Sequence, residues 1–448
     1  MKLSRRKILG GLAATPFIGF AQAQSAPDLR ILSRVIDVKG KAAKVFGIVG
    51  PNGKPGLEMV LGQPFRFNLK NEIDDKTLIH WHGLTPPTAQ DGVPQLSSAL
   101  INIGESRLYD FENTKPGTHW MHSHLGLQEQ RMLAAPLIVH ELEKQLFDEQ
   151  EHVVMLHDFA FRAPEEIMAE LRKGMEDMVM TNDVTYDALL ANDRTLDDPE
   201  ILRSEIGGHL RLRIINASAS TNMWIDLGEL DGALIAVDGN TVFPVGGKHF
   251  PLAIAQRADI RIALPNKPGA WPILFQAEGT TLRSGIIVQS GKAEIVQISD
   301  QGEAGAPLDY SLEMHLHSAA QVLKEPVNNS QFIALTGSDK DYIWGFNGKS
   351  MMHETLFSVR EGERVEVTMQ NQTNMAHPMH LHGHYFKVVG LGDKTIDGAV
   401  RDTILIPAGQ RASIQFDANN PGTWAFHCHH LYHMNSGMMA AFGYAGAA

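Results

Sequence analysis

Histidines recur in His-x-His pairs along the sequence. Four such pairs are His80 and His82, His122 and His124, His380 and His382, and His427 and His429. Alternate residues of a strand point to the same face, so each pair can present two imidazoles together, although in two pairs the members could face neighbouring metals. Imidazole binds Cu, Zn, Fe and Ni. A single pair is as often structural as metal-binding, but four pairs at equivalent places predict a metal centre.

The residues around Cys428 indicate which metal this is. Cys428, the only cysteine of the chain, lies between His427 and His429, and His433 and Met438 follow it. His377 comes from an earlier unit of the same repeat. Two imidazoles, a thiolate and a weak thioether form the ligand set of a blue copper electron-transfer site, whereas zinc prefers four strong ligands. We therefore expect His377, Cys428, His433 and Met438 to bind copper, which keeps the thiolate deprotonated.

The neighbours of Cys428 suggest a second metal cluster. His427 and His429 should project from the face of the strand opposite Cys428. An electron that reaches the thiolate site then has a covalent route to those histidines. This arrangement predicts one site that accepts electrons and another that consumes them.

Three repeats position these residues. Each repeat has an alternating strand, an Asn-containing turn and a second strand, at residues 62–82, 208–226 and 362–382. Each closes with Pro-Gly and another alternating strand, from residues 116, 268 and 421. We expect an all-β fold of three β-sandwich domains over residues 24–145, 146–300 and 301–448. The second repeat lacks the histidines, and helical spacing at residues 164–180 predicts a short helical insertion in it.

The N-terminus predicts export. Arg5 and Arg6 precede an apolar run and an Ala-x-Ala site, which is typical of a twin-arginine signal peptide over residues 1–23. An uncleaved anchor helix is the alternative, but the run is short and Pro16 interrupts it. We expect a periplasmic protein without a membrane segment after cleavage. The net charge of -12 argues against nucleic acid or an anionic membrane as partner.

Taken together, the motifs 80–83, 120–124, 377–383 and 427–438 resemble those of the multicopper oxidases, a family of laccases, cuprous oxidases and ferroxidases. The resemblance covers essentially the whole mature chain. It implies three cupredoxin-like Greek-key domains, four copper ions and the four-electron reduction of dioxygen to water. It also implies that electrons enter through an exposed edge of His433 or His377.

The resemblance assigns a role to each ligand by motif. His377, Cys428, His433 and Met438 match the type 1 site, and His80 and His380 match the type 2 ligands. The type 3 pair is matched by His82, His122, His124, His382, His427 and His429. Every ligand position is filled, unlike in a copper-free cell-division relative. His384 and His430 are not ligands in this scheme.

Protons must reach the site of oxygen reduction. Asp91 stands where the family has an acidic residue, and we expect it to donate protons or to orient the type 2 water, although a plain Asp-Gly turn is the alternative. Many relatives carry a second carboxylate in or just after the His-Cys-His segment. This chain has Leu431 and Met434 there, so water or a glutamate from elsewhere must serve.

The electron donor is left open between Cu(I) and a phenol. Met375 lies where a copper-oxidising relative has a substrate-site methionine, and Met168, Met175, Met178 and Met180 could add a docking patch. Thr373 replaces the associated acid, and a helical row of methionines is more often core. Nothing in the sequence names a phenol pocket, and Tyr432, Met434 and Asn435 give a ferroxidase no carboxylate beside His433.

A copper storage or homeostasis protein without significant turnover is the competing function. The complete type 3 set argues against it, because storage does not need a coupled pair. We expect a monomer.

Overall fold

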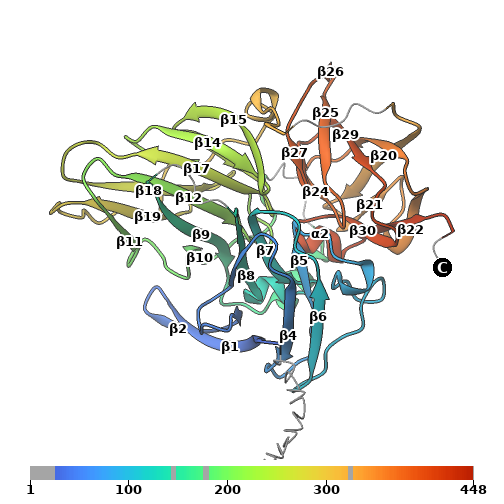
Figure 1. The fold of residues 1–448 in the computed structure, drawn as a ribbon, viewed down its shortest axis with the longest axis horizontal. Helices are drawn as coiled ribbons and strands as arrows, with labels where there is room; N and C mark the ends of the chain where they lie inside the picture. The colour runs from blue at the N-terminus through green and yellow to red at the C-terminus, as the bar shows by residue number, and fades with distance from the viewer. Residues whose placement is uncertain (1–25, 143–147, 175–180, 321–325, 447–448) are drawn as a thin grey trace, which may run out of the picture.

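The computed structural model describes residues 26–142, 148–174, 181–320 and 326–446, and this part of the chain is built almost entirely of strands (Figure 1). Six sheets form three two-layer units that follow one another along the chain. The units run from blue through green and yellow to orange and red in Figure 1. The prediction of an all-β fold is confirmed, whereas the predicted signal peptide lies outside the described residues.

The first unit has sheets of order β2-β1-β4-β6 and β3-β8-β7-β5 around a core that includes Phe65, Trp81 and Tyr109. Its strands are β1 (Asp28–Val38), β2 (Lys41–Val49), β3 (Leu57–Val60), β4 (Phe65–Asn71), β5 (Ile79–His82), β6 (Ser106–Phe111), β7 (Gly117–Ser123) and β8 (Ala134–His140).

The second unit has sheets of order β10-β9-β12-β17-β14-β15 and β11-β19-β18-β13-β16, packed around residues such as Leu212 and Phe275. Its strands are β9 (Gln150–Phe159), β10 (Ala188–Ala191), β11 (Glu200–Ser204), β12 (His209–Asn216), β13 (Met223–Asp226), β14 (Gly232–Val237), β15 (Asn240–Gly247), β16 (His249–Leu252), β17 (Arg257–Ala263), β18 (Gly269–Ala277) and β19 (Arg283–Ser290).

The third unit has sheets of order β21-β20-β23-β29-β25-β26, with β27 beside β25, and β22-β31-β30-β24-β28. Its strands are β20 (Asn329–Ser338), β21 (Ile343–Phe346), β22 (Met351–Val359), β23 (Arg364–Asn371), β24 (His377–Leu381), β25 (Phe386–Leu391), β26 (Lys394–Thr395), β27 (Val400–Arg401), β28 (Thr403–Ile406), β29 (Arg411–Asp417), β30 (Thr423–Cys428) and β31 (Met438–Tyr444).

A buried asparagine shapes the same turn in each repeat. Asn71, Asn216 and Asn371 end β4, β12 and β23, and each is at most 1 % exposed. Each side-chain amide donates to backbone carbonyls of the turn and of a neighbouring strand, and each side-chain oxygen accepts the backbone N–H two residues on. These bonds satisfy backbone groups that are buried at the turn. The Asn-containing turns seen in the sequence are therefore equivalent in structure.

Strand register places the paired histidines. The strand after each Asn turn pairs with the strand after each Pro-Gly, as β5 with β7, β13 with β18 and β24 with β30. His80 lies opposite His122 in the first unit, and His380 lies opposite His427 in the third. At the same place in the second unit, β13 has Met223 and Trp224, so this unit offers no histidine there.

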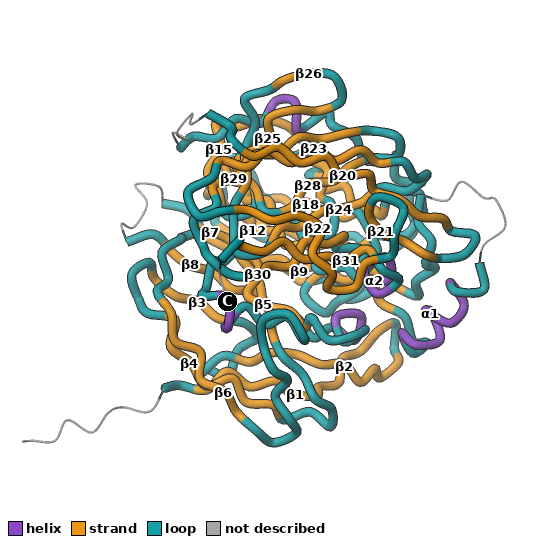
Figure 2. The backbone as a smooth tube through the Cα atoms, turned by 90° about the vertical axis from the view of Figure 1, so that its right-hand side faces the viewer, coloured by secondary structure: helices purple, strands orange, loops and turns teal. Residues whose placement is uncertain are grey.

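Helices are short in the described chain. They are α1 (Pro164–Leu171), α2 (Leu431–Asn435) and the 3-10 turns η1 (Thr88–Gln90), η2 (Glu129–Arg131) and η3 (Glu313–His315). The helix predicted over residues 164–180 ends at Leu171, and residues 175–180 lie outside the described part. Figure 2 shows α1 and α2 on the same side of the molecule, where Ser436 contacts Met168. No helix among the described residues is long and apolar enough to cross a membrane.

Candidate metal centre

The thiolate site forms where β24, β30 and α2 meet. The Cys428 Sγ atom lies 3.6 Å from His377 Nδ1 and 3.9 Å from His433 Nδ1, and the two Nδ1 atoms are 3.3 Å apart. The other imidazole nitrogens face polar groups outside this point, since His377 Nε2 lies 2.8 Å from the Thr373 hydroxyl and His433 Nε2 lies 3.3 Å from Asp183. Two imidazole nitrogens and one sulfur therefore converge on one point.

Burial sets the chemistry of this site. Burial raises the pKa of the Cys428 thiol, so a metal cation is needed to hold it as a thiolate. Met438 is fully buried in the same hydrophobic cluster as Cys428. The fourth predicted ligand thus shares a hydrophobic core with Cys428.

The expectation of an exposed imidazole edge is wrong. His377 and His433 are each 0 % exposed. The Trp344 ring of β21 lies over His433 with centroids 4.1 Å apart, and Tyr342 also lies beside this imidazole. An electron donor on the surface is therefore separated from the site by at least one side chain.

Asp183 covers the thiolate site from the second unit. Its carboxylate accepts hydrogen bonds from the Tyr342 hydroxyl at 2.6 Å and from His430 Nε2 at 3.0 Å, besides its contact with His433. Burial alone would raise the pKa of Asp183, but His430 and His433 hold it well below its usual range. No local pattern predicted this carboxylate, because Asp183 is 250 residues before His433 in the chain.

His430 lies beside the thiolate site, but it is not one of the three side chains whose atoms converge there. Its ring stacks on that of His433 with centroids 3.7 Å apart, and it caps the N-terminus of α2. His384 is bonded to the Tyr444 hydroxyl at 2.7 Å. Both positions agree with the expectation that neither residue is a ligand.

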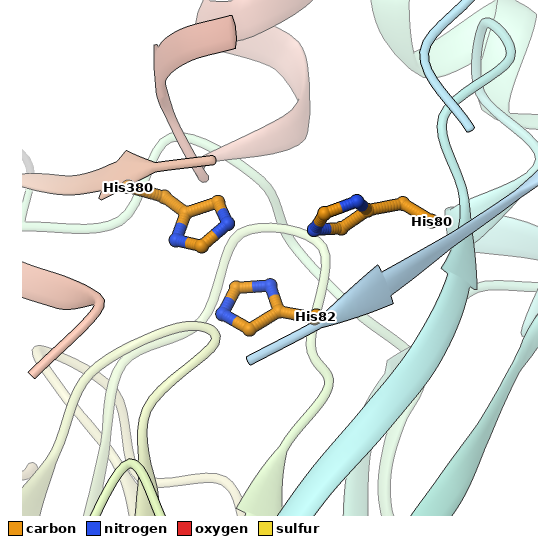
Figure 3. Close-up of side chains that lie close together, drawn as sticks. All are labelled: His80, His82 and His380. Carbon is orange, nitrogen blue, oxygen red and sulfur yellow. The ribbon is translucent and has the colours of Figure 1, made fainter. Parts of the chain in front are cut away.

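Eight further histidines form three groups between the first and third units. The groups in which three imidazole nitrogens lie within 4.8 Å of one another are His80 with His82 and His380, His82 with His122 and His429, and His124 with His382 and His427. Each group has members from both units. Figure 3 shows His80 and His82 facing His380 across the boundary.

The free nitrogens of these rings fit a metal cluster. Six buried ring nitrogens have no hydrogen-bond partner: His80 Nε2, His82 Nδ1, His122 Nε2, His124 Nδ1, His380 Nε2 and His429 Nε2. Leaving so many buried polar atoms unpaired is costly unless something else binds them. Burial also lowers the pKa of His82, His122, His124, His380, His382 and His429 well below the usual range, and that of His427 to about 3. Neutral imidazoles with free lone pairs are what a metal ion requires.

Asp91 links two of the ligands. Its side chain is fully buried just after η1 and lies 2.9 Å from His382 Nδ1 and 3.1 Å from His80 Nδ1. The simple Asp-Gly turn therefore places a carboxylate directly beside the cluster. This contact orients one histidine from each unit.

Two other buried carboxyl groups were missed from the sequence. Glu129 of η2 lies 3.0 Å from His122 Nδ1 and 3.8 Å from His429 Nδ1, and burial raises its pKa well above the usual range. Asp402 lies 3.0 Å from His82 Nε2. Glu129 follows His124 by five residues, but nothing in its neighbourhood separates it from a surface glutamate.

A cavity of about 410 Å³ opens beside this cluster. It reaches the ligand candidate His124 and is lined largely by apolar groups, among them Pro94, Leu125, Met434 and Met439. A small uncharged molecule could therefore approach His124 through this opening.

Comparison with known proteins places the chain in a family. Three multicopper oxidase models match residues 33–144, 150–292 and 324–446. Multicopper oxidase MmcO of Mycobacterium tuberculosis is 26% identical over 87% of this chain and 81% of that protein. A copper resistance protein A homolog of Pseudomonas syringae is 25% identical over 98% of both proteins.

Comparison with solved structures also finds multicopper oxidases. The crystal structure of Fet3p, described as a multicopper oxidase that functions in iron import, matches with a TM-score of 0.80 and 18% identity over 93% of this chain and 90% of that one. Because the three models together span most of the sequence, the chain belongs to the multicopper oxidase family.

Proposed function

We propose that this multicopper oxidase holds four copper ions and joins the one-electron oxidation of a donor to the four-electron reduction of dioxygen. His377, Cys428, His433 and Met438 hold the type 1 copper. His80 and His380 hold the type 2 copper. The type 3 pair is held by His82, His122 and His429 on one side and by His124, His382 and His427 on the other.

One observation carries this proposal. Cys428 contacts the two imidazoles of the thiolate site, while its neighbours His427 and His429 belong to two different histidine groups. The backbone of three consecutive residues therefore connects the two sites covalently. A storage protein has no need of such a connection.

The protein side chains would exclude water from each site and supply protons to the cluster. Bound copper would supply one-electron transfer at the thiolate site and oxygen reduction at the cluster. Burial of the histidines keeps bulk water away from both sites. Asp91 and Glu129 bring carboxyl groups within 3.1 Å of cluster histidines, which supports a role for both in proton supply.

Dioxygen, the proposed acceptor, is small and apolar. The cavity that reaches His124 has a lining suited to such a molecule, with Leu125, Met434 and Met439 around it. This supports entry of dioxygen at the type 3 side, away from the thiolate site.

Cu(I) is the first candidate donor. The copper resistance relative matches this chain over nearly its full length. The Asp183 carboxylate beside His433 would favour a cation near the thiolate site. An exported oxidase of this kind would protect the periplasm from Cu(I), and the twin-arginine signal over residues 1–23 would take it there.

A phenol is the second candidate. Met375 is 4 % exposed and Met168 is 5 % exposed, so neither thioether lies open to an incoming Cu(I) ion. Met168 therefore behaves as core, while Met175, Met178 and Met180 lie outside the described residues. A phenol needs no thioether, so the burial of Met375 and Met168 does not argue against it.

Oxygen uptake by the copper-loaded protein tests the proposal. We expect uptake with Cu(I), with a methoxyphenol or with both, and none from Cys428→Ser with either donor. Copper-loaded protein that binds four ions but consumes no oxygen with any donor would identify a storage protein instead. Met375→Ala compared on both donors separates them, because selective loss with Cu(I) would support a methionine route.

A further inference from the structure

The second unit contributes no histidine to the cluster, yet one of its arginines reaches it. Arg257 begins β17 and is 0 % exposed. Its guanidinium donates from Nη1 and Nη2 to the two carboxylate oxygens of Asp402, at 2.7 Å and 2.6 Å. This two-pronged bond joins the second unit to the third.

Asp402 in turn contacts two cluster histidines. Its carboxylate lies 3.0 Å from Nε2 of His82, and its backbone carbonyl lies 2.8 Å from Nδ1 of His380. The Thr403 hydroxyl donates to the same carboxylate oxygen at 3.0 Å. His82 and His380 are members of one histidine group, with ring centroids 3.8 Å apart.

The contact with Asp402 selects the ligand atom of His82. A carboxylate paired with arginine accepts hydrogen bonds, so Nε2 of His82 carries the hydrogen and Nδ1 keeps the lone pair. His82 Nδ1 has no hydrogen-bond partner, whereas at His80, His122, His380 and His429 the free nitrogen is Nε2. His82 is thus one of two cluster histidines, with His124, whose unpartnered nitrogen is Nδ1.

Further hydrogen bonds hold the guanidinium of Arg257 in place. Its Nε donates to the Thr118 carbonyl at 3.0 Å, and Nη1 also donates to the Ala255 carbonyl at 3.2 Å. Gly83, directly after His82, leaves the space that the guanidinium occupies, because a Cβ there would lie 2.5 Å from Arg257 Nη2. A planar fork in a fixed orientation holds the plane of the bonded carboxylate.

We propose that Arg257 is a positioning residue through which the second unit, which supplies no histidine to the groups of the cluster, controls the copper cluster, by holding Asp402 so that His82 binds through Nδ1. This inference rests on the proposed copper cluster. The second unit then helps to position a copper ligand and does not only separate the first unit from the third.

Arg257→Met tests the proposal, with Arg213→Met as the matched control. Arg213 is also a fully buried arginine of the second unit, and it bonds to Thr118 Oγ1 at 3.1 Å, to Asp259 at 3.1 Å and to Glu151 at 2.9 Å rather than to the carboxylate beside the cluster. Metal analysis gives copper per chain, and visible absorption reports the thiolate site. Electron paramagnetic resonance reports the type 2 copper and shows an additional copper signal when the coupling of the type 3 pair is lost. The thermal midpoint measures the general cost of removing a buried arginine.

We expect Arg257→Met to keep the thiolate absorption and to lose type 3 copper, or the coupling of the type 3 pair, in at least half of the molecules, because His82 is a type 3 ligand. Arg213→Met should lower the thermal midpoint similarly but keep all copper signals. An intact, coupled type 3 pair in Arg257→Met, or the same loss in Arg213→Met, would overturn the inference.

Two more variants cover the case in which Arg257→Met does not fold. Arg257→Lys keeps the charge and loses the fork, and Asp402→Asn keeps the shape and loses the paired charge. Both should disturb the type 3 pair, and the double variant should add little to either, whereas additive effects would contradict action through Asp402. Failure of the proposed function is distinguishable, since the unmodified protein would then bind no cluster copper or consume no oxygen.

Discussion

Glu129 lies where imidazoles of the first and third units meet, and its Oε1 atom is buried without a hydrogen-bond partner. A buried carboxyl group with one oxygen beside a cluster histidine and the other unpaired is suited to carrying a proton to the cluster. We predict that Glu129→Gln lowers oxygen consumption about 100-fold, within the range for loss of an acid–base group. The measurement is oxygen uptake at saturating Cu(I) and at saturating methoxyphenol.

The fall should be equal with both donors, because Glu129 contacts cluster histidines and not the thiolate site. Glu165→Gln is the control, since Glu165 has a side chain that is 60% exposed and pairs with Arg131. Loss with one donor only would place the effect of Glu129 at the donor side and would contradict its proposed role.

At the scale of elements, the Asn turns hold the strand ends from which the histidines project. We predict that Asn216→Ala lowers the free energy of unfolding by about 2–3 kcal/mol, because buried carbonyls of Thr221 and Leu252 lose their donor. Denaturant unfolding measures this change. Copper content should stay the same, because the second unit holds no copper ligand.

Asn266→Ala is the control for this turn, since Asn266 is exposed on the same unit. Its free energy of unfolding should stay within about 0.5 kcal/mol of the unmodified protein. An equal effect of the two substitutions would mean that the buried amide bonds do not stabilise the repeat.

At the scale of the whole molecule, copper should join the first unit to the third, because each histidine group has members from both. We predict a higher thermal midpoint for the copper-loaded protein, with a gain of about 4 kcal/mol when free copper exceeds its Kd a thousandfold. Cys428→Ser should keep most of this gain, because it disrupts only the thiolate site within the third unit. Scanning calorimetry with and without copper measures it, and loss of the whole gain in Cys428→Ser would place the stabilisation at the thiolate site.

The metal-free fold should weaken in acid. Burial lowers the pKa of His157 from the ordinary 6.5 to about 4, so the unfolded chain binds a proton in this range that the folded chain does not. The contribution of His157 to the free energy of unfolding is fully present above pH 6.5 and is lost as the pH falls towards 4. This contribution is on the order of 3 kcal/mol. His157→Gln should flatten the dependence of the denaturation midpoint on pH between 6.5 and 4, and an unchanged slope would contradict this assignment.

The sequence by itself determined the all-β fold, the three repeats and the candidate ligands. Strand periodicity, Asn turns and His-x-His pairs are local patterns, and the register of β5 with β7 and of β24 with β30 follows from them. Asp91 was also predicted, because it stands where the multicopper oxidases have an acidic residue.

Only the tertiary structure decided which groups surround the ligands. Contacts between units join Asp183 to His433, Asp402 to His82 and Arg257 to Asp402. Glu129 contacts His122 of its own unit and His429 of the third. No local spacing encodes these contacts. The burial of His433 beneath Trp344 could not be predicted from the sequence either, because the covering strand β21 is about 90 residues away along the chain. The types of the ligands can thus be predicted from local sequence patterns. The orientation of the ligands and the access of donors to them depend on contacts where the three units pack together.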